Sequence, residues 1–215
     1  MRIVIQCANT KAPGAGSLRT STGKPVSFVA QPLGAPLDGY VVFARPDDPA
    51  DVGGGSWRDL LTTYNATPSN PLKLAPAGRL YANHAYSDLV ARFGLPQVYI
   101  LSAGWGLIRG DFLTPRYDIT FSGAADGYKR RTKADQYADY CQLTDGAEPV
   151  AFFGGKDYLP LFCKLTSAIR AERTVFYASG VPPQAPGCRL VKYDTTTRTN
   201  WHYACVKGFL AGGVK

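Results

Sequence analysis

Two short polar segments carry the residues best suited to chemistry. Asn9 follows the apolar run Ile3–Cys7. Asp118 lies shortly after the apolar run Val98–Ser102 and its glycine-rich turn. Both runs have the pattern of buried strands, and ligands bind at the carboxyl ends of the strands in an open α/β sheet. We therefore predict that the two side chains meet in one crevice, where the carboxylate of Asp118 is the first candidate for chemistry.

Each of these residues also has a simpler interpretation. Asp118 could cap the turn after Pro115 or pair with Arg116, because aspartate is common in turns. Asn9 could be only a turn residue or a helix cap. Cys7 is interpreted as a small buried hydrophobe rather than a nucleophile, because nothing close in sequence activates it. These alternatives stay open on the sequence alone.

The turn Ser102–Gly106 offers a second set of candidates. Gly104 and Gly106 allow tight packing, and their lack of side chains also lets a ligand approach the backbone amides. Trp105 and Tyr117 could line a pocket with aromatic faces, although single aromatic residues more often pack in a core or at its rim.

A second glycine turn, Gly154–Tyr158, follows a later apolar run. It is not a phosphate loop of the NTPase type, because the required spacing and the following Ser or Thr are absent. Gly155, Lys156 and Tyr158 could still bind one phosphate or help to form a base pocket. The alternative is a structural turn into a helix, with Asp157 stabilised by the helix dipole.

The chain has a formal charge of +8, from 24 Lys and Arg against 16 Asp and Glu. This imbalance favours a polyanionic partner through neutralisation of phosphates. Basic residues gather around 129–133, where they could grip phosphates, and around 198–203, where a helix start could hold one. The candidate DNA-binding residues are Arg109, Arg116, Lys129, Arg130, Arg131 and Lys133 in the first group and Arg198, Asn200, Trp201 and His202 in the second. A solvated charged face is the commoner role of such runs.

Cysteine and histidine usage bears on compartment and metals. The five cysteines are odd in number and form no CxxC pair, which predicts reduced thiols in a cytoplasmic protein. The histidines, His84 and His202, have no cysteine or acidic cluster at ligand spacing, so we predict no metal and no cofactor, and we interpret His84 as structural. With no signal peptide and no apolar run near ~20 residues, we expect a soluble protein without membrane contact or an obligate protein partner.

The elements that must position these residues follow from local patterns. Short β-branched or aromatic runs predict strands at 3–7, 40–44, 98–102, 150–153, 174–178 and 189–193. Amphipathic stretches predict helices at 56–64, 79–93, 129–143, 156–171 and 200–210. This alternation predicts an α/β fold, a three-layer domain with a mostly parallel central sheet and helices on both faces.

The chain has 215 residues with 45% hydrophobic content, which predicts a single domain spanning 1–215. Two stretches rich in Gly, Pro, Ser and Thr, 11–39 and 45–55, predict long loops near a rim. Such loops are either functional or flexible surface insertions.

The combination of motifs resembles the YaaA-like superfamily. There, a first strand ending in Cys-x-x-x-Lys is paired with a strand reading Leu-Ser-Ala-x-Tyr-Gly-Leu and with a Pro-Tyr-Asp segment. The matching residues here are Cys7, Asn9 and Lys11, then Leu101–Leu107, then Pro115 and Tyr117–Asp118, with Gly154–Tyr158 resembling the family's Gly-x-x-Tyr turn. Trp105 replaces the usual tyrosine, and Arg116 is inserted after the proline. The match is more specific for fold and site than for reaction.

The resemblance implies work on DNA or nucleobases. Similar proteins include antiviral DNA glycosylases that remove modified cytosine, such as glucosylated hydroxymethylcytosine, from phage DNA. This reaction passes through an oxocarbenium-like sugar, so the site needs an anion near the anomeric carbon, a positioned water and a pocket for a flipped base. For this chemistry Asp118 could supply the charge and activate the water, and the amide of Asn9 could orient that water or hold the sugar or base, so these two residues are the catalytic candidates. The substrate-binding candidates are Cys7, Lys11, Ser102, Gly104, Trp105, Gly106, Tyr117, Gly155, Lys156 and Tyr158.

Two other functions stay open. One is an N-glycosidase or deoxyribosyltransferase that acts on free nucleosides or nucleotides, and the other is a non-catalytic DNA-binding protein of the YaaA kind. The net positive charge favours a polymer over a free nucleoside, because a nucleoside needs few phosphate contacts. The pair Asn9 and Asp118 favours catalysis over binding alone.

Overall fold

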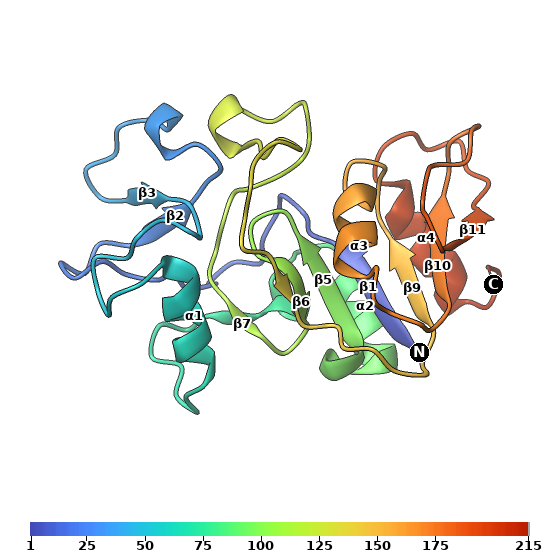
Figure 1. The fold of residues 1–215 in the computed structure, drawn as a ribbon, viewed down its shortest axis with the longest axis horizontal. Helices are drawn as coiled ribbons and strands as arrows, with labels where there is room; N and C mark the ends of the chain where they lie inside the picture. Colours follow the sequence, from blue (N-terminus) through green and yellow to red (C-terminus); the bar gives the residue numbers. More distant parts are fainter. Residues whose placement is uncertain (215) are drawn as a thin grey trace.

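The computed structural model describes residues 1–214 and is built around a seven-stranded sheet in the order β11-β10-β9-β1-β5-β6-β8 (Figure 1). The strands β11, β10, β9, β1 and β5 pair in parallel, β6 runs antiparallel to β5, and β8 is parallel to β6. Their bounds are β1 Arg2–Gln6, β5 Val98–Ser102, β6 Gly106–Arg109, β8 Tyr140–Cys141, β9 Val150–Phe153, β10 Arg173–Tyr177 and β11 Arg189–Lys192.

The central strands are apolar along nearly their whole length. Ile3, Val4 and Ile5 of β1 are fully buried between the neighbouring strands β5 and β9. Strands buried on both faces are typical of parallel sheets with flanking helices, which explains why continuous apolar runs were such clear strand signals. The predicted strands of this sheet at 3–7, 98–102, 150–153, 174–178 and 189–193 are confirmed to within about one residue at each end.

Four helices and four short 3₁₀ turns accompany the sheet. Their bounds are α1 Trp57–Asn65, α2 His84–Phe93, α3 Leu159–Leu165, α4 Trp201–Leu210, η1 Pro32–Gly34, η2 Ala77–Arg79, η3 Leu95–Gln97 and η4 Gly127–Lys129. Ser56 and Asp59 form a capping box at α1, and the Asn83 side chain caps α2. Helix α4 packs against α2, β9 and β10. The α/β class with a mostly parallel sheet is confirmed, while the three-layer arrangement stays a prediction.

The helix predicted at 129–143 is wrong. Within the described residues this stretch holds only the end of η4 and the strand β8, whose Tyr140 and Cys141 pair with β6. Arg131 is held in a buried ion pair with Asp139, eight residues along the chain. Long-range pairing has therefore overridden the local helical pattern. The predicted helix at 79–93 is also interrupted, since η2 ends at Arg79 and α2 begins five residues later.

The glycine- and proline-rich stretches are more ordered than the predicted loops. The first stretch contains β2, Val26–Phe28, which pairs in parallel with β3, Val42–Ala44, outside the main sheet. The strand predicted at 40–44 is β3, which begins two residues later than predicted. A third pair joins β4, Ala75–Pro76, to β7, Leu113–Thr114. The fully buried Phe28 packs its ring against Trp105, with centroids 5.0 Å apart. The insertion, residues 11–55, is therefore anchored to the core. The assignment of 1–215 to a single domain stays a prediction.

Among residues 1–214, none of the helices is both long enough and apolar enough to cross a bilayer.

Candidate active site

A cavity of about 1080 Å³ lies at the carboxyl ends of β1, β9 and β10. Its walls come mainly from four segments, 6–11 after β1, 118–120, 154–159 after β9, and 195–203 leading into α4. The chain passes from β1 to β5 on one side and reaches β9 on the other side of β1, so the cavity sits where the strand order reverses direction. Such switch points are where open α/β sheets bind their ligands.

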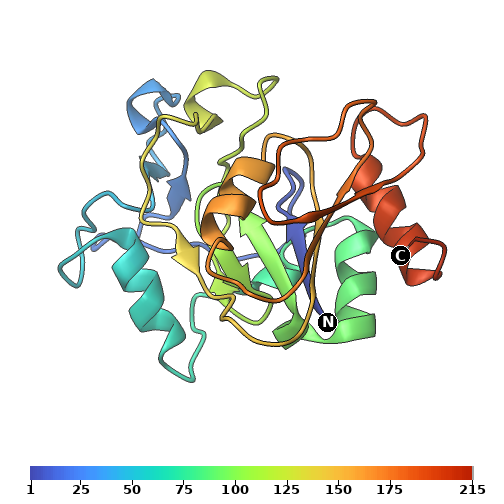
Figure 2. The same cartoon turned by 45° about the vertical axis from the view of Figure 1, so that its right-hand side comes forward.

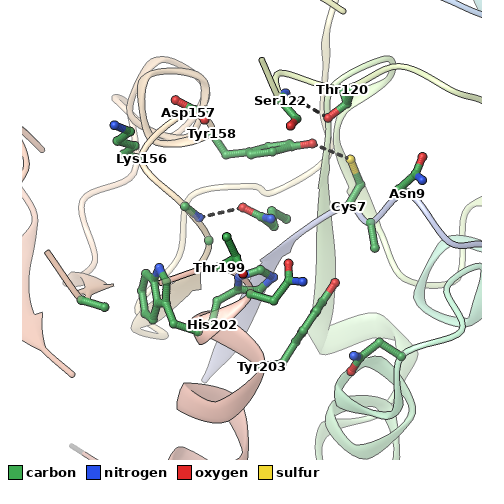
Figure 3. A pocket seen from close by; sticks show the side chains of 18 of the residues that line it. Cys7, Asn9, Thr120, Ser122, Lys156, Asp157, Tyr158, Thr199, His202 and Tyr203 are labelled. Carbon is green, nitrogen blue, oxygen red and sulfur yellow. Dashed lines mark hydrogen bonds between the residues drawn. The ribbon is translucent and has the colours of Figure 1, made fainter. Parts of the chain in front are cut away.

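Asp118 and Asn9 line this one cavity. The backbone N–H of Asp118 donates to the carbonyl of Phe28 at 2.7 Å, which holds the residue against the insertion. Asn9 is exposed on the turn after β1, and Figure 3 shows it beyond Cys7 on the same wall. The prediction that two segments about 110 residues apart along the chain converge is therefore confirmed by their shared cavity.

The carboxylate of Asp118 is paired but not enclosed. Its partner is Lys129, whose Nζ lies 3.1 Å away, and the Asp118 side chain keeps 34% exposure. The same Nζ lies 2.9 Å from Asp126. Hydrogen bonds to Asp126 and Asp118 raise the pKa of Lys129, so this lysine stays charged. The ion pair predicted as the alternative role of Asp118 thus exists, with Lys129 in place of Arg116, and it leaves part of the carboxylate open to the cavity.

A group of buried hydroxyl and thiol side chains lies partly in the cavity wall and partly beneath it. The Cys7 thiol lies 3.2 Å from the Tyr158 hydroxyl (Figure 3), and the hydroxyls of Tyr81 and Tyr117 lie 2.6 Å apart. Burial raises the pKa of Tyr81, Tyr117 and Tyr158 well above the ordinary value, so these phenols are uncharged donors and acceptors at neutral pH. Cys7 and Tyr158 line the cavity, whereas Tyr117 does not.

The second glycine turn forms the wall opposite Asn9. The backbone N–H of Gly155 donates to Oε1 of Gln6 at 2.7 Å, which ties the end of β9 to the end of β1. A Cβ on Gly154 would lie 2.4 Å from the ring of Phe152, so only glycine fits there. Gly155 and Lys156 line the cavity as predicted, and Lys156 is exposed at its edge.

The start of α4 forms the remaining wall. Arg198, Asn200, Trp201 and His202 all line the cavity itself, not a separate outer surface. Asn200 takes a left-handed conformation with φ of 57° and provides no side-chain cap for the helix. His202 is only 2% exposed, its Nε2 has no hydrogen-bond partner among the described residues, and burial lowers its pKa to about 4. An uncapped helix start and a neutral imidazole therefore face the same space (Figure 3).

The first glycine turn is structural, which corrects its predicted role. Ser102 Oγ accepts from the N–H groups of Gly104 and Trp105, and Arg58 donates to the carbonyls of the same two residues. Gly106 has φ of +89°, and a Cβ there would lie 2.5 Å from the Tyr140 carbonyl oxygen. These backbone groups of the turn are therefore engaged within the protein, and none of the residues of the turn lines the cavity.

The two aromatic residues predicted as base platforms are also in the core. Trp105 is 0% exposed, and its ring contacts Phe28, Tyr117 and Tyr140. Tyr117 is 3% exposed, and the Nζ of Lys11 lies 4.5 Å from its ring centroid. A base can stack on neither ring, because both side chains are buried.

Two of the predicted DNA-binding arginines have other roles. Arg131 is buried and bonds bidentately to Asp139 at 2.7 Å for each contact. Arg109 pairs with Asp111 and lines a separate, smaller cavity. Lys129 is held by two acids. Arg116, Arg130 and Lys133 are exposed, and their contact with DNA stays a prediction.

Sequence reasoning missed several cavity residues. Gln6, Thr120, Thr199 and Tyr203 line the cavity without having been singled out. Gln6 carried a usable signal, because a polar residue ending an apolar strand is placed at the carboxyl edge of the sheet. The others come from irregular segments or from a helix face that only tertiary packing orients.

No group of three His, Cys, Asp or Glu side chains that could hold a metal occurs among residues 1–214. Comparison of the chain with protein-family models, curated proteins and solved structures finds no match.

Proposed function

We propose that the protein is a DNA glycosylase that hydrolyses the N-glycosidic bond of a modified base and leaves an abasic site. The observation that carries this proposal is the shared cavity of Asp118 and Asn9, whose volume of about 1080 Å³ has room for a flipped nucleotide. The resemblance to YaaA-like proteins and to antiviral glycosylases, with modified phage DNA as substrate, belongs to the same proposal.

In the proposed mechanism Asp118 faces the anomeric carbon of the flipped nucleotide. As the base departs, positive charge develops on the sugar, and the carboxylate stabilises it because a preorganised anion needs no reorganisation. Lys129 holds the carboxylate in place from behind. The amide of Asn9 orients the water that attacks the sugar, and Asp118 takes its proton. Residues of this chain supply the whole reaction, without a metal or cofactor.

The opposite wall is proposed to hold the backbone phosphate of the substrate. The start of α4 has no side-chain cap and lies at the cavity, and the exposed Arg198 lies three residues before the first residue of the helix. The buried, unpartnered Nε2 of His202 is the second sign of a missing polar ligand, because buried polar atoms normally have partners. Helix N-termini bind phosphate through such N–H groups and the helix dipole.

A surface with exposed apolar side chains favours DNA over a small molecule as the substrate. Leu33 and Leu37 are fully exposed at 104% relative accessibility, and Tyr40 at 85%. They lie on the segment of η1, which packs against η4, the turn that carries Lys129 (Figure 2). The exposed Arg130 directly follows η4, and exposed apolar side chains combined with such cations are typical of proteins that insert a wedge between base steps.

We further propose that a three-layer α/β arrangement frames the cavity. Figure 1 supports it by drawing α3 in front of the sheet and α2 and α4 behind it. A cytoplasmic location belongs to the same proposal, and the free state of Cys7, Cys141, Cys163, Cys188 and Cys205 supports it.

The direct test is base release. The protein is incubated with DNA that carries plain, hydroxymethylated or glucosylated cytosine, the DNA is treated with alkali, and strand breaks at abasic sites are counted. Breaks confined to modified DNA are the expected result. Salt-sensitive binding without any released base would overturn the enzymatic proposal and leave a DNA-binding protein.

Cleavage of free nucleosides or nucleotides is the second candidate. Its support is the loss of two predicted phosphate contacts, since Arg131 is buried in the protein and Arg109 lies at another cavity. Release of base from free nucleotides but not from DNA would favour this candidate over the first.

A further inference from the structure

Lys11 lies at the cavity, and backbone contacts hold the chain on both sides of it. The residue lies just beyond β1 and forms an isolated antiparallel bridge with Tyr81. The N–H of Ala12 donates to the carbonyl of Leu80 at 2.8 Å, and the N–H of Ala82 donates to Thr10. The neighbouring segment 80–82 therefore holds the backbone on both sides of Lys11, and Lys11 is one of the residues that line the cavity that contains Asp118.

The Lys11 amine is unusual among the lysines around this site. Its Nζ lies over the ring of Tyr117, 4.5 Å from the centroid, and it forms no ion pair with the described residues. Burial lowers its pKa, an effect that the nearby Arg116 and Lys129 reinforce and that Cys7 and Asp118 oppose. A larger fraction of this amine is therefore unprotonated than for an ordinary lysine, which is the form that acts as a nucleophile.

The other two lysines at the site lack this combination. Lys129 is bound by two carboxylates, so its amine stays protonated. Lys156 is exposed at the edge of the cavity and solvated. A cavity that admits a deoxyribose to Asp118 thus brings it to one desolvated amine, that of Lys11.

We propose that Lys11 gives this protein a second activity, the cleavage of a DNA strand at an abasic site through a covalent imine. The inference rests on the proposed function in one respect, because it takes the cavity to be the place where the sugar binds. It goes beyond that function, since hydrolytic base removal leaves the strand intact.

The chemistry needs no oxidant, reductant or metal. The lone pair of Lys11 Nζ attacks C1′ of the open-chain abasic sugar, and the aldehyde oxygen leaves as water, so that a C=N bond forms. The carboxylate of Asp118 takes a proton from C2′, the C3′–O bond breaks, and its electron pair departs with the 3′ phosphate. Water then adds to the imine carbon and releases an unsaturated aldehyde, which restores the Lys11 amine.

The test uses a duplex that already contains one abasic site, so its result does not depend on base release. The full-length protein is incubated with this duplex and with sodium borohydride, which reduces an imine to a stable secondary amine. We expect a covalent protein–DNA adduct on a denaturing gel, and peptide mass mapping should place it on Lys11. Without borohydride, we expect strand breaks that need no alkali.

Two variants test whether the amine of Lys11 forms the adduct. Lys11→Arg keeps the positive charge but has no amine that forms an imine, so it should lose the adduct and the breaks. Lys164→Arg changes an exposed lysine on α3 that does not line the cavity, and it should keep both.

An adduct of equal yield in Lys11→Arg, an adduct mapped to Lys156 or to the N-terminal amine, or no adduct in the unaltered protein would each overturn the proposal. If Lys11→Arg does not fold, the mapped position in the unaltered protein still decides. Base release from modified DNA together with intact abasic duplex would reject the lyase activity alone, whereas lyase activity without base release would reject the glycosylase alone.

Discussion

At the scale of single residues, the structure separates side chains that look alike in the sequence. Arg130 and Arg131 are neighbours, yet one is exposed and the other is buried against Asp139. Asp118 and Asp126 both pair with Lys129, yet only Asp118 lines the cavity. Such pairs provide matched controls for tests of catalysis and stability.

Asp118→Asn should slow base release about a thousandfold, because the sugar cation loses its stabilising charge and the water loses its base. DNA affinity should change little, since the variant keeps every positive charge and leaves the cavity shape intact. Single-turnover release and fluorescence anisotropy measure the two quantities. Asp126→Asn is the control and should keep the release rate. A rate near that of the unaltered protein in Asp118→Asn would contradict the proposed mechanism.

Arg131→Ala should lower the free energy of unfolding by about 3–5 kcal/mol, because it leaves the carboxylate of Asp139 buried without its partner. The two side chains are 5% and 2% exposed, so solvent cannot compensate. Arg130→Ala, one residue away and exposed, should change the same free energy by less than about 0.5 kcal/mol. Urea unfolding followed by circular dichroism measures both. Equal stability of the two variants would show that the ion pair is not what holds this segment.

At the scale of elements, the start of α4 has two polar features that lack a partner. Its first turn has no side-chain cap, and its second residue, His202, buries an imidazole without a partner for Nε2. Both cost stability in the absence of a ligand. Functional sites often contain such locally destabilising features, and here both features lie at the cavity.

His202 should make the protein less stable in acid. Burial lowers its folded pKa from 6.5 to about 4. Between these values the unfolded chain binds more protons than the folded one, so the free energy of unfolding decreases as pH falls through this window. The loss attributable to His202 is about 3 kcal/mol. In His202→Gln the decrease between pH 7 and pH 4 should be smaller by this amount, measured by urea unfolding at each pH.

His84→Gln is the control for this measurement, because His84 is exposed at the start of α2. It should follow the pH dependence of the unaltered protein. An unchanged pH dependence in His202→Gln would mean that the imidazole is not buried uncharged in solution.

At the scale of the whole molecule, the insertion and the sheet make different contributions. The sheet places the ends of β1, β9 and β10 around the cavity. The insertion that carries β2 and β3 holds Asp118 through the carbonyl of Phe28 and extends an exposed apolar tip beyond η4 (Figure 2). The fold thus joins a small-molecule-sized cavity to a surface large enough for a polymer.

Replacing Leu33 and Leu37 together by Ser should weaken DNA binding and slow base release, because the tip can no longer insert between base steps. Both side chains are fully exposed, so the free energy of unfolding should change by less than about 0.5 kcal/mol. Anisotropy with duplex DNA measures the binding. Val52→Ser, in the neighbouring stretch, is the control and should bind normally. Unaltered affinity in the double variant would remove this surface from the DNA interface.

The sequence by itself determined the mostly parallel α/β framework and the expected position of Asn9 and Asp118 beyond the ends of its strands. Continuous apolar runs such as Val98–Ser102 are local signals of strands buried on both faces, and they hold whatever the rest of the chain does. The rule that ligands bind at the carboxyl ends of such strands then pointed to Asn9 and Asp118.

Only the tertiary structure decided which neighbours of these residues are functional. Burial of Trp105 and Arg131 depends on partners that lie far away in the chain, Phe28 for the first ring and the core-facing Asp139 for the second side chain. The same long-range pairing turned the helical pattern at 129–143 into a strand and an irregular segment. Local periodicity describes how a segment can fold, whereas desolvation and pairing, which settle a side chain's role, are set by what packs against it.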